Sequence, residues 1–180
     1  MGDLAGACLR GESPESASRV SLPDRDPIAD ALKDFVYGLV VIGSRSSAGE
    51  PNGMTATWVC QVSFEPRMFA IAVQAGAHTR RNIEETGVFS VSALPEGSKD
   101  LSLKFTKKSA SGEGRLEDEP MSYGVTGAPV LKAATAWIEC EVVGKIEPGD
   151  HVIFIGKVVD GEKLKGRATT LRDTGMSYAG

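Results

Sequence analysis

Residues 52–66 read NGMTATWVCQVSFEP, and this stretch carries a clear strand signal. Bulky or apolar side chains alternate with Thr, Val, Gln and Ser from Met54 to Ser63. Because successive side chains of a strand point to opposite faces, the alternation predicts one strand over residues 54–63. Its small hydroxyl side chains would let a flat ligand approach the backbone closely. An ordinary strand with solvated threonines explains the same pattern, and the pattern alone favours that interpretation.

Apolar runs on both sides of this stretch predict further strands, which lie at residues 39–42, 68–73, 88–92, 136–143 and 151–159. Residues 106–129 are rich in Gly, Ser and charge, and they predict a long loop. Six or more strands at short spacing, with only a few short helices, favour a closed barrel over alternating strands and helices. The expected fold is therefore mainly β.

Three short helices are expected. The first is capped by Asp26, ends at Gly38, and has Ile28, Ala31, Leu32 and Phe35 on its apolar face. The second spans 79–86, with Thr79 as its cap and Gly87 closing it. The third spans 98–105.

Composition bounds the class of protein. The chain has 180 residues, a formal net charge of −4, three cysteines and two histidines. This length suits one folded domain, expected at 26–180, after a polar leader at 1–25 that is expected to be disordered. The net negative charge gives no overall positive field that would attract nucleic acid. No apolar run reaches the roughly 18 residues of a membrane span. The spacing of Cys and His predicts no metal site and no disulfide scaffold, so a cytoplasmic location is expected.

Several common catalytic motifs are absent from the sequence. It contains no G-x-G-x-x-G after a strand, no Walker A loop, no G-x-S-x-G elbow and no C-x-x-C. Hydrolase, kinase and dinucleotide-fold interpretations therefore have no support.

Two further segments could carry chemistry. In GAHTRRNI, residues 76–83, a helix start with Thr79 and two arginines could bind one phosphate, although simple capping explains it as well. In GDHVIFIGKV, residues 149–158, His151 opens a strand beside an acidic turn and could contact a cofactor or substrate amide. A structural histidine is the plainer alternative.

The three segments together, in this order, resemble the flavin reductase-like family of FMN-binding split β-barrels, which are Greek-key barrels with a few short helices. The resemblance covers about residues 28–178 and also rests on YGLVVIGS (37–44), HTRRNIEETGVFSVSAL (78–94) and the terminal MSYA (176–179). It is strongest for the flavoredoxin and rubredoxin-reducing flavin reductase subgroup. No C-x-x-C module is fused to this chain, so a rubredoxin partner would be a separate protein.

The resemblance implies a homodimer that binds FMN, with FAD as a possible substitute, and uses NADH or NADPH. Asn52 and the 55–58 backbone would meet the flavin ring, Gln61 and Ser63 would line the ribityl-phosphate path, and His78 with Thr79 would open the phosphate site. His151, the expected catalytic residue, would lie near flavin and nicotinamide. Carried over by motif, the full set of cofactor-binding positions is Asn52, Met54, Thr55, Ala56, Thr57, Trp58, Gln61, Ser63, His78, Thr79, Lys108, His151 and Tyr178.

Three functions remain open at this point. The first is NAD(P)H-dependent flavin reduction, with electrons passed on to a monooxygenase, rubredoxin or another acceptor. The second is a flavoredoxin-like electron carrier that holds FMN and does not use NAD(P)H itself. The third is a sensor on the same barrel that binds haem or another small ligand, which only fold-level analogy supports.

Overall fold

The computed structural model describes residues 26–107, 111–112 and 115–176. The expected leader at 1–25 lies outside the described residues. Seven antiparallel strands form the main sheet, in the spatial order β2-β1-β5-β10-β11-β4-β3. Their bounds are Val40–Arg45 (β1), Pro51–Ala56 (β2), Val59–Phe64 (β3), Arg67–Gln74 (β4), Val88–Ala93 (β5), Ala136–Ile146 (β10) and His151–Lys163 (β11). The predicted mainly β fold with a few short helices is confirmed.

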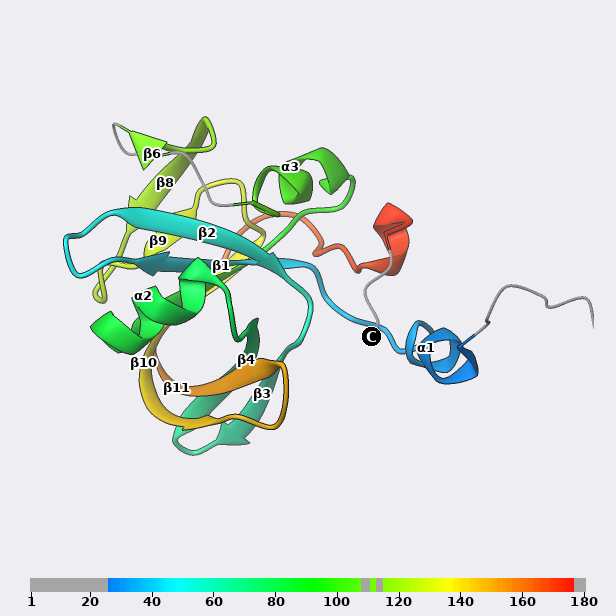
Figure 1. Cartoon of the computed structure of the whole chain (residues 1–180). Coiled ribbons are helices and arrows are strands. Elements are labelled where there is room, and N and C mark those ends of the chain that lie inside the picture. Colours follow the sequence, from blue (N-terminus) through cyan, green and yellow to red (C-terminus); the bar gives the residue numbers. More distant parts are fainter. Residues whose placement is uncertain (1–25, 108–110, 113–114, 177–180) are drawn as a thin grey trace, which may run out of the picture.

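The sheet closes on itself because its two outermost strands are neighbours in sequence. β2 ends at Ala56 and β3 begins at Val59, so only Thr57 and Trp58 join the opposite edges of the sheet. Two residues cannot cross the width of a flat seven-stranded sheet. The strands therefore curl round a common interior, as the lower part of Figure 1 shows.

The prediction of one strand over residues 54–63 is wrong. The chain leaves the first edge at Thr57, whose carbonyl accepts a hydrogen bond from Val59 N at 3.1 Å, and it joins the second edge where Ala72 N donates to Trp58 O at 2.9 Å. The alternation of side chains continues through this corner without a break. Alternation shows that a segment is extended, but it does not show which strand the segment pairs with.

The interior of the barrel holds the larger apolar cluster, which includes Ile42, Ile71, Phe89 and Phe154. A second cluster, around Leu39, Val41, Phe105 and Leu131, lies on the other side of β1. β1 is consequently buried on both faces, which explains the continuous apolar run at residues 39–42.

Helix α2, His78–Thr86, packs against β1 and β2 and places Ile83 in the interior cluster. Its N-cap is Ala77, which offers no side-chain bond, so the predicted Thr79 cap is wrong. Thr79 lies inside the helix, and its hydroxyl accepts a hydrogen bond from Asn52 instead. The predicted closure at Gly87 is confirmed, because this residue has φ 69°, a conformation that suits glycine.

Helix α1, Pro27–Leu32, begins as predicted, with Asp26 Oδ1 accepting from Ile28 N at 2.9 Å and from Ala29 N at 3.1 Å. It ends at Leu32, earlier than the predicted Gly38. No residue of α1 is buried, and Ile28 is 71% exposed. Its apolar face therefore stays largely exposed in the described chain, which periodicity could not reveal.

The predicted loop at 106–129 is partly a small sheet. Its strands are β6 (Ser111–Gly112), β7 (Arg115–Leu116), β8 (Glu119–Tyr123) and β9 (Pro129–Leu131), preceded by α3, Lys99–Lys104. Strands this short, separated by Gly and charged residues, have too few positions to show a period. The last element is the 3-10 helix η1, Arg172–Thr174, near the C-terminal end of the described chain.

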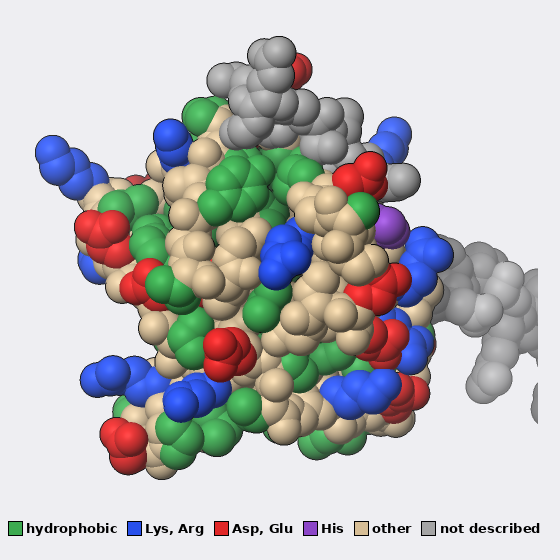
Figure 2. All heavy atoms as spheres, turned by 90° about the vertical axis from the view of Figure 1, so that its left-hand side faces the viewer, with side chains coloured by type: hydrophobic (Ala, Val, Ile, Leu, Met, Phe, Trp, Pro, Cys, Tyr) green, Lys and Arg blue, Asp and Glu red, His purple; other side chains and the backbone are tan. Residues whose placement is uncertain are grey.

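Charges are mixed on the face seen in Figure 2, where acidic and basic side chains alternate among the described residues. Within the described residues, no helix is both long and apolar enough to cross a membrane. The same residues contain no group of three or more His, Cys, Asp or Glu side chains that could hold a metal ion.

Candidate active site

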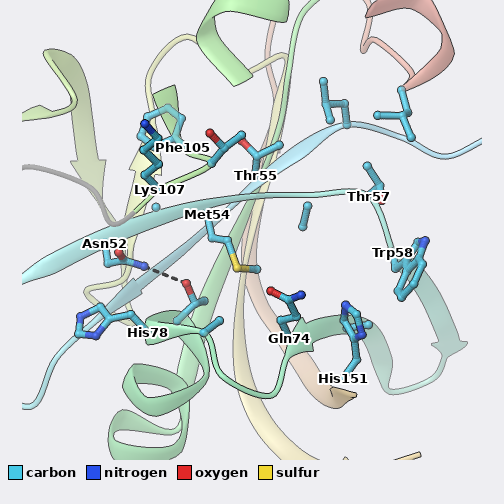
Figure 3. Close-up of a pocket in the computed structure, with 18 of the residues that line it drawn as sticks. Asn52, Met54, Thr55, Thr57, Trp58, Gln74, His78, Phe105, Lys107 and His151 are labelled. Carbon is cyan, nitrogen blue, oxygen red and sulfur yellow. Dashed lines mark hydrogen bonds between the residues drawn. The ribbon is translucent and has the colours of Figure 1, made fainter. Parts of the chain in front are cut away.

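A cavity of about 510 Å³ lies where β2, the Thr57–Trp58 corner and the start of α2 meet. The C-terminal end of β4, the start of β11, the end of α3 and the last described residues complete its wall (Figure 3). The cavity is lined by Leu39, Asn52, Gly53, Met54, Thr55, Ala56, Thr57, Trp58, Ala72, Gln74, Ala77, His78, Thr79, Phe105, Thr106, Lys107, His151, Leu171 and Met176.

One end of the cavity rests on a buried polar cluster. Asn52 Nδ2 donates to Thr79 Oγ1 at 2.9 Å and to Ser44 Oγ at 3.3 Å, and Asn82 Nδ2 donates to the same Ser44 oxygen at 3.2 Å. Asn52, Thr79 and Asn82 are each at least 96% buried. The cluster fixes the start of α2 against β2, and it leaves the Thr79 hydroxyl proton available to a ligand.

Basic side chains lie at the same end. His78 begins α2, and its Nδ1 lies 3.3 Å from an Arg81 guanidinium nitrogen. Lys107 reaches the cavity from the segment after α3, on the other side of β2 (Figure 3). Together with the free backbone N–H groups at the start of α2, these side chains favour an anion such as a phosphate.

The opposite end is aromatic. The rings of Trp58 and His151 have centroids 4.7 Å apart and an interplanar angle of 49°. His151 is 92% buried, and its Nδ1 lies 2.8 Å from Asp150 Oδ1. This hydrogen bond and the attraction of the His151 ring hold the pKa of Asp150 below its usual value. The contact fixes the orientation of the imidazole at the cavity wall.

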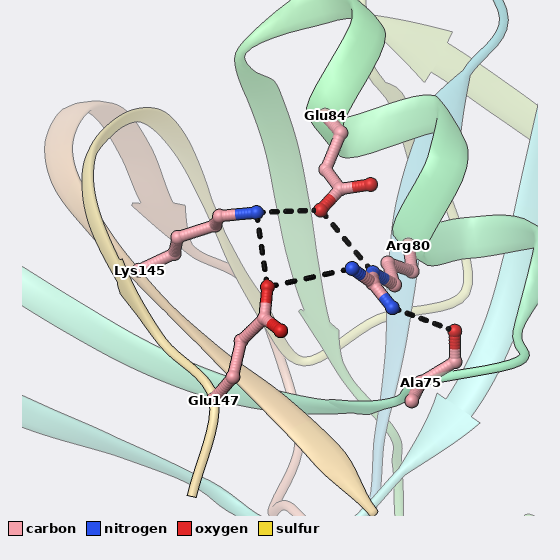
Figure 4. Close-up of polar contacts among 5 residues, drawn as sticks. All are labelled: Ala75, Arg80, Glu84, Lys145 and Glu147. Atoms are coloured by element: carbon pink, nitrogen blue, oxygen red, sulfur yellow. Dashed lines mark hydrogen bonds and ion pairs between the residues drawn. The ribbon is translucent and has the colours of Figure 1, made fainter.

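Arg80 does not belong to the anion end, although the sequence places it next to Thr79. Its guanidinium contacts Glu84 at 3.2 Å and Glu147 at 3.4 Å, and Lys145 contacts the same two carboxylates (Figure 4). Arg80 also donates to Ala75 O at 3.2 Å. The hydrogen bond from Lys145 lowers the pKa of Glu84, with Arg80 adding to the effect. These four side chains, which we call the ion-pair clamp, tie α2 to the turn between β10 and β11.

The structure brings most of the predicted site residues together. Those that line the cavity are Asn52, Met54, Thr55, Ala56, Thr57, Trp58, His78, Thr79 and His151. Gln61 and Ser63 do not line it, because they lie on β3, beyond the corner, where Gln61 Nε2 donates to Ser63 O at 3.0 Å. Lys108 and Tyr178 lie outside the described residues.

Sequence reasoning missed several residues of the cavity wall. Gln74, Phe105 and Lys107 carry polar or aromatic groups there, and Leu39, Leu171 and Met176 supply apolar surface. They come from four distant parts of the chain, so no local pattern could have grouped them. Lys107 is the neighbour of the lysine that was predicted.

Comparison with known proteins identifies the family. The Flavin reductase like domain family matches residues 32–178, and the chain belongs to this family. It is 31% identical over 135 residues to a probable flavin reductase of Rhizobium meliloti, covering 75% of this chain but only 42% of that protein. It is 32% identical over 144 residues to a flavin reductase (NADH) of Kitasatospora aureofaciens, covering 78% of this chain and 73% of that protein.

Solved structures agree with this assignment. The NADH:FAD oxidoreductase SgcE6 of Streptomyces globisporus, in complex with NAD and FAD fragments, superimposes with a TM-score of 0.67 at 29% identity, over 76% of this chain and 80% of that one. The styrene monooxygenase flavin reductase of Pseudomonas putida superimposes with a TM-score of 0.69 at 26% identity, over 78% of this chain and 89% of that one. The predicted split-barrel fold of the flavin reductase family is therefore confirmed.

The chemistry of the cavity fits a flavin nucleotide. Its middle, along Met54, Ala56 and Ala72, is apolar and built from small or unbranched side chains, which suits a flat ring. Positive groups stand at one end for a phosphate. Thr57 adds a buried hydroxyl oxygen that has no hydrogen-bond partner among the described residues, at the corner where a polar ring edge would lie.

Proposed function

We propose that this chain is an NAD(P)H-dependent flavin reductase that binds FMN, or FAD in its place, in the cavity. The observation that carries the proposal is the pairing, in one cavity, of an anion-binding end, formed by Lys107 and the start of α2 at His78, with an aromatic end at Trp58 and His151. A flavin nucleotide has the matching shape, a planar ring joined to a phosphate. The NAD and FAD fragments named with SgcE6 add support from a relative.

The flavin, when bound, supplies the redox chemistry, because its ring accepts a hydride from the nicotinamide. The chain's own residues bind and orient the two ligands. The Thr79 hydroxyl and the start of α2 donate to the phosphate, while Lys107 neutralises its charge. His151, kept in place by Asp150, forms one wall beside the reacting rings. No side-chain base is needed for hydride transfer, and effective positioning supplies most of the rate.

Anaerobic titration tests the proposal. The protein loaded with FMN should lose its flavin absorbance on addition of NADH or NADPH, and the two titrations should show which nucleotide is preferred. His151→Ala should slow this reduction in stopped-flow experiments, while Lys132→Ala, an exposed lysine outside the cavity wall, should not. A protein that takes up no FMN would contradict the proposal and favour a sensor of haem or another ligand.

The same titration separates the reductase from the flavoredoxin-like carrier predicted as the alternative. A carrier would bind FMN and keep its absorbance when NADH is added, yet it would be reduced by a partner protein. The similarity to the rubredoxin-reducing subgroup stays a prediction. The reductases of two-component monooxygenases found among the relatives favour an oxygenase as the acceptor of the reduced flavin.

We also propose that the working form is a homodimer, located in the cytoplasm. Large apolar side chains exposed on the described chain, among them Phe64 at 86% and Phe35 at 64%, are available to cover a second copy. Sedimentation of the FMN-loaded protein should give twice the mass of the 19.0 kDa chain. A monomer at micromolar concentration would contradict this.

A further inference from the structure

Gln74 is a polar residue of the cavity wall to which the flavin reductase interpretation gives no role. It is the last residue of β4, and its partner in the neighbouring strand is His151. Residues paired across two strands point their side chains to the same face, about 5 Å apart. Figure 3 shows both side chains directed into the cavity, near Met54.

The two neighbours differ in how they are held. His151 is buried and hydrogen-bonded to Asp150. Gln74 is exposed to the cavity, and its carboxamide makes no hydrogen bond to the described residues. Only its backbone is used, where Ala77 N donates to Gln74 O at 2.9 Å. The side chain is therefore dispensable for the fold and available to a ligand.

A carboxamide offers a donor and an acceptor side by side, which matches another O=C–N–H group in a pair of hydrogen bonds. The surroundings strengthen such a pair, since Met54, Ala72 and Trp58 line the same cavity and would exclude water from a bound ring. A carboxylate or an ammonium at this position could make only half of the pair.

We propose that Gln74 is a specificity-determining residue that binds the amide edge of a planar ring lying against Trp58 and His151. The inference rests on the proposed function, because the two ligands of a flavin reductase both carry such an edge. One is the pyrimidine part of the flavin ring, and the other is the carboxamide of the nicotinamide. Gln74 selects ligands by this shared chemistry.

The variants Gln74→Leu and Gln74→Glu test the proposal. Leu removes both hydrogen-bonding functions, and Glu keeps the shape but loses the N–H donor. Lys157→Leu is the matched control, because it places leucine at an exposed position of β11 away from the cavity. The Kd for FMN is measured by flavin fluorescence, and the KM for NADH is measured at saturating FMN. Both Gln74 variants should keep the wild-type melting temperature and lose about tenfold in one of the two constants.

The constant that changes identifies the ring whose amide edge Gln74 binds. A raised Kd for FMN assigns Gln74 to the flavin. A raised KM for NADH with an unchanged Kd for FMN assigns it to the nicotinamide. The loss caused by Gln74→Leu should then be smaller with the 3-acetylpyridine analogue of NADH, which keeps the carbonyl acceptor but lacks the amide N–H. If both constants stay within twofold of wild type in both variants, the proposal is wrong. Failure of the reductase function itself would look different, because the wild-type protein would then bind no FMN or keep its colour with NADH.

Discussion

Strands β2 and β3 come from one continuous stretch of sequence, but β2 lines the cavity and β3 is exposed. β2 buries Asn52 and Gly53 and supplies most of one wall of the cavity. β3 leaves Cys60, Gln61, Val62 and Phe64 exposed, and none of its residues lines the cavity. Both strands are sheet edges with the same alternating pattern. The difference arises from what packs on each edge.

β2 is covered because other elements reach it. α2 packs on it, Thr55 N donates to Phe105 O at 3.0 Å, and Thr55 Oγ1 donates to Ser102 O at 2.6 Å. β3 has hydrogen bonds to β4 on one side only. A strand pattern therefore indicates that a segment is extended, whereas the elements that cover it decide whether it forms a site.

The largest expected effect comes from overfilling β2. A Cβ atom at Gly53 would lie 2.8 Å from Phe105 Cδ1 and 3.0 Å from Leu116 Cδ2. Gly53→Val should reduce the free energy of unfolding by about 2–3 kcal/mol in urea titrations, because the packed side chains must shift. Cys60→Val on β3, which is exposed, should change it by less than about 0.5 kcal/mol. Equal effects would show that the two edges are packed alike.

The second-largest effect on stability concerns the buried polar cluster that Asn52 forms with Thr79, Ser44 and Asn82. Asn52→Ala removes the donor of two buried hydrogen bonds and should cost about 2 kcal/mol of stability. It should also weaken FMN binding, since Thr79 loses its support. Gln61→Ala on β3 is the comparison for stability and should cost about 0.5 kcal/mol or less. Chemical unfolding measures the first effect and fluorescence titration the second.

Thiol reactivity distinguishes an exposed strand from a buried one. Cys60 on β3 is exposed, whereas burial, with a contribution from Glu139, raises the pKa of Cys140 on β10 to about 12. In a Cys8→Ser background, a thiol reagent at pH 8 should modify one cysteine of the native protein and two after denaturation. Two reactive thiols in the native protein would contradict the burial of β10.

The smallest effect concerns the ion-pair clamp, which holds α2 and through it β2. The pKa of Glu84 is lowered in the fold, so its ion pairs add stability above the unfolded pKa and lose it as pH falls through the lower folded value. Lys145→Met should lower the melting temperature by about 1–2 °C at pH 7 and low salt. The difference should vanish near pH 3 and in 1 M salt, and Lys132→Met should show none.

Prediction from sequence succeeded for long, periodic segments. The five strands expected outside residues 54–63 all exist, and the start of α1 and the end of α2 follow their capping residues. It failed for the corner at Thr57, the cap at Thr79 and the small sheet within 106–129. The first two failures involve contacts between residues far apart in the chain, such as the 27-residue separation of Asn52 and Thr79. The strands of the small sheet are too short to show a period.

The residues of the candidate site also divide into those that the sequence predicted and those that it did not. Nine of the predicted site residues line the cavity, because the family motifs lie on segments whose local structure is fixed by their own pattern. Gln74 and Lys107 were not found, because β4 reads as an ordinary core strand and Lys107 lies in a segment without a period. Arg80 was expected near a phosphate, and its acidic partners on α2 and after β10 direct it elsewhere.

The sequence by itself determined that residues 52–66 are extended and that the protein has the residues of a flavin-binding barrel. The hydrophobic period, the turn residues and the helix caps are local properties of the sequence, and they do not depend on the tertiary structure. Only the tertiary structure decided that this stretch bends at Thr57, so that one half forms a site and the other an exposed edge. That choice depends on the burial of apolar area between distant strands, which no local pattern contains.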